Sequence, residues 1–324
     1  MIAKTETEEI RASYRACKDE THRHAKSFYF SSHVLTAEQK NAAYAVYAFC
    51  RLADNTIDAG DARDGSARRQ LDQLREQLQR VYNDSTGPVG IWPAFRDTVH
   101  RHQIPLEHFL DLLRGVEMDL TRQTYSTFTE LEEYCYCVAS VVGLVMARIF
   151  GVRDSQAYRH AADMGTAMQL TNILRDIKED YGMGRRYIPL EDMDRFGYSD
   201  VELGRGIVNG PFRRLMTFEI ERARMYYDSA EKGIPLLIGF GSRACVRLMS
   251  RTYGTILNVI ESRDYDVFAE RASVSAPRKL AIAGDTMLSL LVHGSMTENR
   301  PLSLHDAPLT DLSLHPPQQH RRSP

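Results

Sequence analysis

Hydrophobic and polar positions repeat with the 3.6-residue period of an α-helix along most of this 324-residue chain. No long stretch alternates with the two-residue period of a β-strand, and no repeat of 20–50 residues is present, which argues against a solenoid. The pattern predicts an all-α fold, with helical segments near residues 6–20, 37–57, 66–83, 92–102, 105–120, 128–150, 155–181, 211–232, 242–262 and 276–292.

Breaks in the periodicity predict where the helices start and where the folded domain ends. Thr36 with Gln39 and Thr129 with Glu132 have the spacing of a capping box. Glycines interrupt the pattern between residues 181 and 210, which indicates a loop with short helical pieces. Five of the twelve prolines follow Thr297. We therefore expect one all-α domain over residues 1–294 and a disordered tail over residues 295–324.

Charge and cysteine content narrow the class of protein. A formal net charge of -2 gives no broad basic field, so nucleic acid is not an expected partner. The five cysteines include no CxxC, which fits a reducing cytoplasm, and the first residues lack the apolar region of a secretory signal. The most apolar stretch, residues 138–152, is shorter than the roughly 20 residues of a membrane span. We expect a cytoplasmic protein, at most peripheral to the inner face of the membrane.

Two helical segments each carry a pair of aspartates four residues apart, Asp54 with Asp58 and Asp176 with Asp180. Carboxylates at this spacing share one helix face and can hold a divalent cation. Four of them around one cavity would repel one another unless metal ions and an anionic ligand were present. The two pairs therefore predict magnesium, with manganese as an alternative ion, and a diphosphate. A single pair would more often be an ordinary solvated helix face.

Further polar residues extend each aspartate pair into a stripe. Tyr47 and Arg51 fall within about 60° of the first pair on a helical wheel, and Gln169 and Asn172 align with the second. Polar stripes on largely apolar helices are typical of a cavity lining. Arg51 could clamp an anion, as could Arg185 and Arg186 in the following loop, although solvated arginines are the structural alternative.

The segment HRHAKSFYF offers His24, Lys26 and Ser27 as donors to a second anionic group, with a helix N-cap at Ser27 as the structural alternative. Tyr134, in EYCYCVASVVG, could face a carbocation or guide a proton, and Tyr253, in SRTYGTILNVI, raises the same possibility. Both could equally be ordinary core aromatics.

Taken in order, these residues resemble the squalene and phytoene synthase family from His24 to about Leu280. The resemblance runs through HAKSFYF, YAFCRLADNTID, GVEMDL, YCYCVASVVG, MQLTNILRDIKED and GRRYIPLEDM, and GLVMARIFGV is most similar to the phytoene-forming members. It implies an isoprenoid-synthase helical bundle around a central cavity. It also implies a prenyltransferase that condenses two geranylgeranyl diphosphates, through prephytoene diphosphate, to phytoene in carotenoid biosynthesis.

The resemblance also implies roles for individual residues. Magnesium would be held by Asp54, Asp58, Asn172, Asp176 and Asp180, and no NADPH would be needed. The resemblance assigns substrate contacts to Tyr47, Arg51, Asn172 and Arg271 and a place in the cavity lining to Gln169, Tyr134 and Tyr253. With the donors His24, Lys26, Ser27 and Arg185, predicted from their chemistry, these are the expected contacts of the isoprenoid diphosphate. We expect Asp54, Asp58, Asp176, Asp180, Tyr134 and Arg51 to serve catalysis. Peripheral membrane association and a downstream carotenoid desaturase are the partners it suggests.

Three positions depart from the family pattern: Asn55 replaces an acidic residue, Ser140 replaces a glycine, and Val116 replaces a methionine. Because Asn55 and Ser140 could alter metal binding or cavity width, the length of the substrate's prenyl chain stays open. The nearest alternative is an enzyme that converts farnesyl diphosphate to presqualene diphosphate, squalene or dehydrosqualene. A non-catalytic scaffold on the same fold is a further alternative.

Overall fold

The computed structural model describes residues 2–58, 65–83 and 89–293, and within these ranges the chain is helical except for loops and two isolated β-bridges. Across the same ranges, the fourteen α-helices are α1 (Ile2–His24), α2 (Lys26–Ser31), α3 (Ala37–Asp58), α4 (Ser66–Tyr82), α5 (Trp92–Arg101), α6 (Leu106–Thr121), α7 (Phe128–Cys135), α8 (Val141–Phe150), α9 (Gln156–Gly182), α10 (Leu190–Phe196), α11 (Asp200–Gly204), α12 (Gly210–Gly233), α13 (Phe240–Ser262) and α14 (Ala276–His293). Short turns η1 (Ser32–Val34), η2 (Tyr136–Ser140) and η3 (Ile234–Leu236) join some of them. The all-α prediction is confirmed, and α10 and α11 are the short helices expected in the glycine-rich loop. The predicted tail lies outside the described residues.

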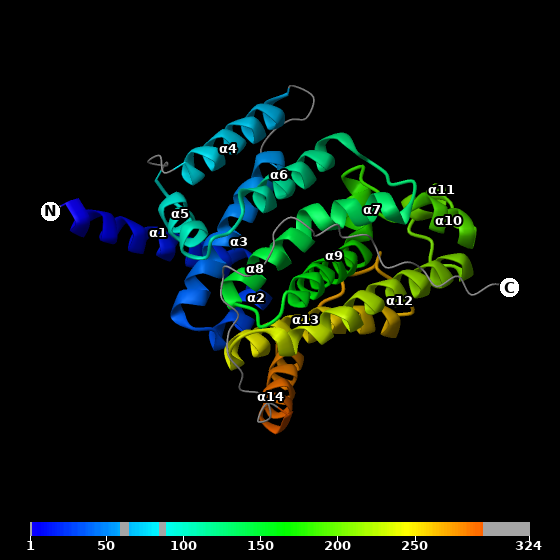
Figure 1. The fold of residues 1–324 in the computed structure, drawn as a ribbon. Helices are drawn as coiled ribbons and strands as arrows, with labels where there is room; N and C mark the ends of the chain where they lie inside the picture. Colours follow the sequence, from blue (N-terminus) through cyan, green and yellow to red (C-terminus); the bar gives the residue numbers. More distant parts are fainter. Residues whose placement is uncertain (1, 59–64, 84–88, 294–324) are drawn as a thin grey trace.

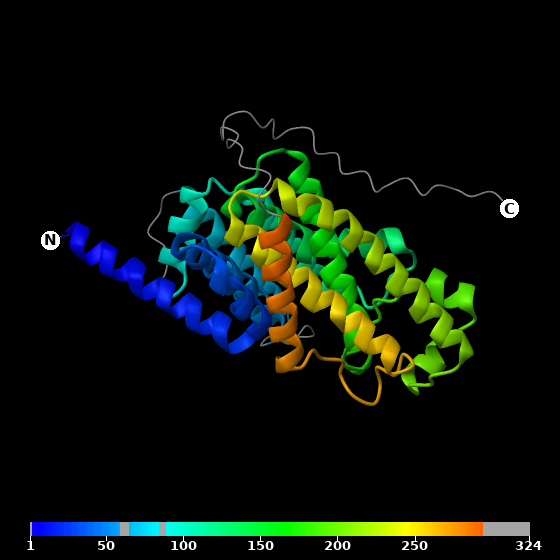
Figure 2. The ribbon, with the colours of Figure 1, turned by 90° about the horizontal axis from the view of Figure 1, so that it is seen from below.

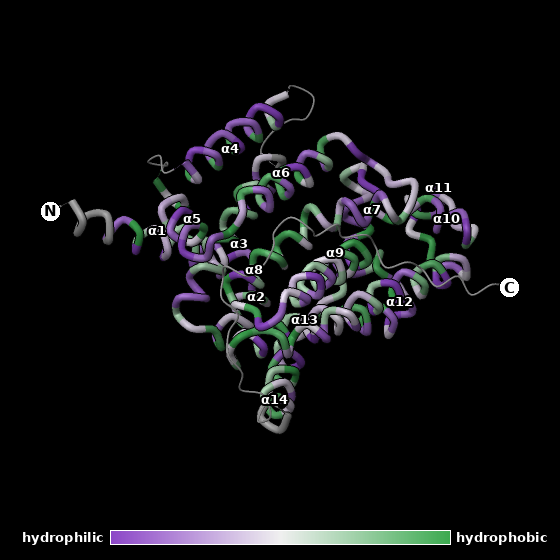
Figure 3. The backbone as a smooth tube through the Cα atoms, viewed as in Figure 1, coloured by the Kyte–Doolittle hydropathy of each residue, from purple (hydrophilic) through white to green (hydrophobic). Residues whose placement is uncertain are grey.

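Helices α3 and α9, which carry the two aspartate pairs, belong to different halves of the bundle (Figure 1). Helix α3 packs against α1, α4, α5 and α6, whereas α9 packs against α12, α13 and α7, and α8 contacts both. One apolar core forms around α9 and α12, and a second forms around α3, α5 and α6. Figure 3 shows the corresponding pattern, with α8 largely apolar and the peripheral α4 largely polar. The fold therefore holds the two polar stripes on helices that share α8 as a common neighbour.

Backbone glycines allow α8 and η2 to lie directly against α9. A Cβ on Gly143 would fall 2.1 Å from the carbonyl oxygen of Ala161, and one on Gly165 would fall 2.4 Å from that of Ala139. Ser140 donates its hydroxyl to the carbonyl of Ala162 at 2.9 Å. The serine that replaces the family's glycine at position 140 therefore adds a hydrogen bond to α9.

The predicted helix over residues 128–150 is interrupted. Residues Tyr136–Ser140 form a π-helical turn, which inserts an extra residue between α7 and α8. The run Phe128–Phe150 is long and apolar enough to cross a membrane, so the expectation drawn from residues 138–152 was too restrictive. In this structure 56% of its most apolar stretch is buried inside the protein, as in a core helix.

Helix starts agree in part with the capping boxes expected from the sequence. The backbone N–H of Gln39 donates to Thr36 Oγ1 at 3.2 Å, and that of Thr36 to Gln39 Oε1 at 3.4 Å, as predicted. The start predicted at Thr129 was wrong, because Thr127 caps α7 by accepting from the N–H of Glu130 at 3.3 Å. The capping threonine lies two residues earlier, where the chain is still extended.

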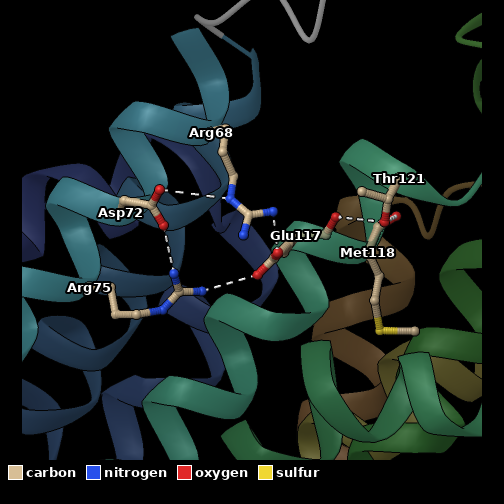
Figure 4. A network of polar contacts seen from close by, with 6 residues as sticks. All are labelled: Arg68, Asp72, Arg75, Glu117, Met118 and Thr121. Carbon is tan, nitrogen blue, oxygen red and sulfur yellow. Dashed lines mark hydrogen bonds and ion pairs between the residues drawn. The ribbon is translucent and has the colours of Figure 1, made fainter. Parts of the chain in front are cut away.

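Ion pairs fasten the peripheral helix α4 to α6 (Figure 4). Arg75 contacts Glu117 at 3.1 Å and Asp72 at 2.8 Å, and Arg68 pairs with the same glutamate. The arginines are partly exposed, so each pair contributes little to stability and mainly fixes the register of α4.

A buried ionic cluster joins α10 to α12. Arg222 Nη1 donates to Asp192 Oδ2 at 2.8 Å and to both oxygens of Glu219 at 2.9 and 2.7 Å. Its guanidinium lies between the rings of Phe128 and Phe218, 3.9 and 4.6 Å from their centroids. Two carboxylates face one cation, and burial together with the charge of Asp192 outweighs Arg222 and raises the pKa of Glu219 to about 8. The cluster anchors α10, which directly follows the loop carrying Arg185.

This raised pKa predicts how stability depends on pH. Glu219 takes up a proton on folding, so its favourable contribution is complete below its ordinary pKa of 4.5 and is lost as the pH rises towards about 8. Glu219→Gln removes this titration, and the variant should gain stability relative to the wild type between pH 5 and pH 8. Urea unfolding of both proteins across that range measures the difference. A difference that stays constant with pH would contradict this assignment.

Candidate active site

The stripe on α3 places Tyr47, Arg51 and Asp54 together. Burial raises the pKa of Tyr47 to about 12; the nearby Arg51 opposes this rise and Asp54 adds to it. Asp54 is exposed, in the last turn of the described part of α3. The side chain of Asp58, where α3 ends, lies outside the described residues, so its role stays a prediction.

The stripe on α9 faces a polar site. Asn172 Nδ2 donates to Gln169 Oε1 at 3.4 Å. Asn172 Oδ1 is buried and has no hydrogen-bond partner in the described part of the chain. A buried carbonyl oxygen without a donor is costly unless something else satisfies it. One turn further along α9 lies Asp176, and Asp180 follows it.

Two arginines converge on Asp176. Its Oδ1 accepts from Arg175 Nε at 2.8 Å and Arg271 Nε at 2.7 Å, and its Oδ2 accepts from Arg175 Nη2 at 2.5 Å and Arg271 Nη2 at 3.0 Å. Burial alone would raise the pKa of Asp176, but these bonds lower it below its ordinary value. Arg175 and Arg271 thus place two guanidinium groups at one point of the site, and such groups are suitable donors for an anionic ligand.

Asp180 has a different environment from Asp176. Burial and the charge of Asp176 raise the pKa of Asp180 to about 7, and Arg185 opposes the rise. The backbone N–H of Arg185 donates to the carbonyl of Asp180 at 2.8 Å, which holds this arginine beside the end of α9. Arg186 instead forms an ion pair with Asp200 at 2.5 Å and points to α11, so it is neither a solvated arginine nor part of this cluster.

Behind this cluster, Tyr134 is buried against Asp119 and Tyr187. Both phenols donate to Asp119, Tyr134 to Oδ2 at 3.0 Å and Tyr187 to Oδ1 at 2.7 Å. Asp119 and Tyr187 were missed by sequence reasoning. The available signal was an aspartate among apolar residues in GVEMDL, which is typical of a carboxylate that faces inward.

The segment around Ser27 forms a separate group. Ser27 is not an N-cap, because Ala25 occupies that position of α2 and no side chain caps the helix. Lys279 Nζ, at the start of α14, donates to Ser27 Oγ at 2.9 Å. Figure 2 shows α14 crossing the bundle between α13 and the N-terminal helices, which accounts for this contact. Lys26 is exposed nearby, whereas His24 pairs with Glu20 at 3.4 Å.

Tyr253 lies on the α13 side of the cluster. Burial raises its pKa, and its charged neighbours are Arg175, Asp176 and Arg271. A cavity of about 370 Å³ opens at Arg175 and Arg271, between the α9 face that carries Lys178 and Glu179 and the segment Val267–Arg271, whereas Tyr253 and Asp176 do not line it. The structure thus brings Tyr253, Asp180 and Arg271 close to Asp176, with Asn172 and Gln169 further along the same helix and Arg185 beside Asp180. It places Tyr47, Arg51 and Asp54 on a separate helix.

Three residues of the polar stripe on α9, Asn172, Asp176 and Asp180, form what we call the α9 row, and their chemistry fits a magnesium ion. Asn172, Asp176 and Asp180 offer oxygen atoms at successive turns of one helix, the donor type that magnesium prefers, and the buried Asn172 Oδ1 lacks any other partner among the described residues. Among the described side chains, no three His, Cys, Asp or Glu residues are arranged to hold a metal by themselves. A cation bound to Asp176 must share that carboxylate with Arg175 or Arg271, or displace one of them.

Comparisons with known proteins identify the family of this chain. Residues 21–278 match the squalene/phytoene synthase family model. The chain is 36% identical to 15-cis-phytoene synthase of Synechocystis sp., over 84% of this chain and 83% of that protein. It is 37% identical to phytoene synthase of Arthrospira platensis, over 83% of this chain and 90% of the relative.

Solved structures give the same result for the fold. A dehydrosqualene synthase with a bound ligand superposes with a TM-score of 0.82 at 30% identity, covering 89% of this chain and all of that one. A squalene synthase from Alicyclobacillus acidocaldarius superposes with a TM-score of 0.73 at 28% identity, covering 80% of this chain and 96% of that one. With the family model matched over most of its helical part, this chain belongs to the squalene/phytoene synthase family.

Proposed function

We propose that this prenyltransferase condenses two molecules of geranylgeranyl diphosphate to phytoene, through prephytoene diphosphate, in carotenoid biosynthesis. The observation that carries the proposal is the 36–37% identity to two phytoene synthases over more than four fifths of the chain. The two arginines that converge on Asp176 support it, because a diphosphate needs such donors. Magnesium, held by the α9 row and by the aspartates of α3, would neutralise the charge of the departing diphosphate.

The chain's own residues supply the rest of the chemistry. When the C1–O bond of the first substrate breaks, Arg175, Arg185 and Arg271 are placed to bind the departing diphosphate. The double bond of the second substrate attacks the allylic cation, and a proton is lost as the cyclopropane closes. Loss of the second diphosphate then permits rearrangement to a linear C40 cation, which gives up a proton, with the released diphosphate as an available acceptor, to form the central double bond of the product. The rings of Tyr134 and Tyr253 offer negative faces to these cations, and the apolar helices around them exclude water.

The expected product bears on where in the cell the enzyme works. The C40 product is a hydrocarbon, which favours a cytoplasmic enzyme that works at the inner face of a membrane and passes its product to a carotenoid desaturase. Flotation of the protein with vesicles, before and after turnover, tests the membrane contact.

Product analysis tests the proposed activity. Purified protein is incubated with radiolabelled geranylgeranyl diphosphate or farnesyl diphosphate and magnesium, each with and without NADPH. A C40 triene formed without reductant is the expected result. If a C30 product forms from farnesyl diphosphate and no C40 product forms from geranylgeranyl diphosphate, the nearest alternative replaces the proposal. No hydrocarbon from either substrate would favour a non-catalytic scaffold.

Removing the metal should stop the reaction. EDTA is expected to abolish turnover, because the departing diphosphate then lacks its counter-ions, and excess magnesium should restore it. Manganese is added in a parallel assay to compare the two ions. Turnover that continues undiminished in chelator would be incompatible with the aspartate pairs as metal sites.

A further inference from the structure

Asp119 occupies a central position that none of the predicted roles accounts for. It lies on α6, and it receives hydrogen bonds from Tyr134 on α7 and from Tyr187 in the loop after α9. Three segments of the chain therefore meet at one carboxylate. Asp119 also contributes to the raised pKa of Asp180 and of Arg185, which places it close enough to the α9 cluster to influence its charge.

The hydroxyl protons of this cluster can be assigned. Tyr187 donates its only proton to Asp119 Oδ1 at 2.7 Å. Tyr134 donates to Asp119 Oδ2 at 3.0 Å, with Tyr187 Oη at 3.3 Å as its other acceptor. In either case the proton of Tyr134 points into the cluster. The lone pairs of its oxygen receive no hydrogen bond from these two partners, since the proton of Tyr187 is already used.

The hydrogen bond from Tyr134 to Asp119 changes the electrostatic potential that the phenol presents to a nearby cation. A phenol that donates to a carboxylate carries more electron density on its oxygen and ring than a phenol bonded to water. Burial also raises the pKa of Tyr134 well above its ordinary value, so it remains a neutral donor. The negative end of the phenol dipole is then directed away from Asp119.

The rings are held in place as well as the hydroxyls. Tyr134 and Tyr187 stack with centroids 5.0 Å apart and an interplanar angle of 26°, and Tyr125 stacks on Tyr187 at 5.8 Å and 22°. Tyr125 Oη is buried and has no hydrogen-bond partner among the described residues. Its hydroxyl therefore provides a matched control, because it belongs to the same stack but does not bind the carboxylate.

We propose that Asp119 is a positioning residue for carbocation formation: it holds the proton of the Tyr134 hydroxyl inside the protein, and the electron-rich phenol faces the allylic and cyclopropylcarbinyl cations. Tyr187 donates a hydrogen bond to the other oxygen of the Asp119 carboxylate and so helps to hold it in place. This inference rests on the proposed function, and it assigns Asp119 an effect exerted chiefly through Tyr134, with the influence of its charge on Asp180 and Arg185 as the smaller contribution.

A double-mutant cycle tests this dependence. Asp119→Asn and Tyr134→Phe should each lower kcat by about 10²-fold with little change in KM, the size of effect expected for a group that stabilises charge in the transition state. The double variant should be no slower than Tyr134→Phe by more than roughly threefold, because the two residues act as one unit. Tyr187→Phe should lower kcat by a smaller factor, and Tyr125→Phe should leave it unchanged. Multiplicative effects in the double variant would overturn the proposal.

A second measurement does not depend on turnover. In protein labelled with ¹³C at the tyrosine Cζ, the resonance of Tyr134, assigned with Tyr134→Phe, should shift in Asp119→Asn, while that of Tyr125 should not. An unmoved Tyr134 resonance would show that the hydrogen bond is absent and would overturn the proposal, whatever the substrate proves to be. A wild-type protein inactive with both diphosphates would instead overturn the proposed function. Thermal unfolding of each variant separates loss of fold from loss of activity.

Discussion

Asp176→Ala is expected to lower kcat by at least about 10³-fold while the protein stays helical. Asp176 is the point at which Arg175, Arg271 and the α9 row meet. Its removal would delete an oxygen ligand that we propose for the metal, and it leaves the two arginines without their shared anion. Steady-state turnover of geranylgeranyl diphosphate at saturating magnesium measures the loss, and circular dichroism measures the fold.

The neighbouring carboxylate provides the control for this prediction. Glu179 is more exposed than Asp176, and it approaches Arg271 at 3.8 Å. Glu179→Ala removes one negative charge from the same turn of α9 but leaves the row of Asn172, Asp176 and Asp180 complete. Its kcat should stay within a few-fold of the wild type. Equal losses in the two variants would mean that total charge matters and that the position of Asp176 does not.

Gly143→Ala is expected to lower the free energy of unfolding by about 3 kcal/mol. The added methyl group would lie 2.1 Å from the carbonyl oxygen of Ala161 and 2.9 Å from its carbonyl carbon, both backbone atoms of α9. Neither can rotate away, so α8 and α9 must separate. The aspartates and Asn172 on α9 would then shift relative to the rest of the site, and activity should fall with stability.

Gly254→Ala, in α13, is the matched control. A Cβ at Gly254 meets no atom of the described residues within 4 Å, so the substitution adds helix propensity without a clash. It should raise the free energy of unfolding by roughly 0.5–1 kcal/mol. Urea unfolding of both variants gives the two values. A destabilisation of Gly143→Ala no larger than the ordinary effect of a surface substitution would show that the two helices can move apart at little cost.

The sequence predicted the helices and the two polar stripes well, because both follow from local periodicity. Each stripe needs only the geometry of one helix, so the spacing of Gln169, Asn172, Asp176 and Asp180 is enough to align them. The π-helical turn could not be predicted in this way, because a single extra residue leaves apolar residues on both sides of the break. The capping assignment at Thr129 failed by two residues, because several polar residues near that helix start fit the same spacing.

Contacts between distant segments account for the remaining differences. Arg271 reaches Asp176 only because the segment after α13 returns to α9. Tyr187 reaches Asp119 only because the loop after α9 returns to α6. Periodicity carries no information about such returns. Arg175 was overlooked because an arginine next to an aspartate in sequence usually points away from it on a helix, whereas here its long side chain folds back to the neighbouring carboxylate.

The bond between Lys279 and Ser27 joins residues 252 positions apart. During synthesis, the N-terminal helices leave the ribosome long before α14 exists, and domains of this size begin to fold as they emerge. A nascent chain that stops before Lys279 can therefore form α3 and α9 with their aspartates, yet it lacks the cation that reaches Ser27 and, until residue 271, the arginine that reaches Asp176. The anion site at Asp176 is completed only by the segment between α13 and α14, so premature termination before residue 271 would yield a largely helical protein with an incomplete anion site.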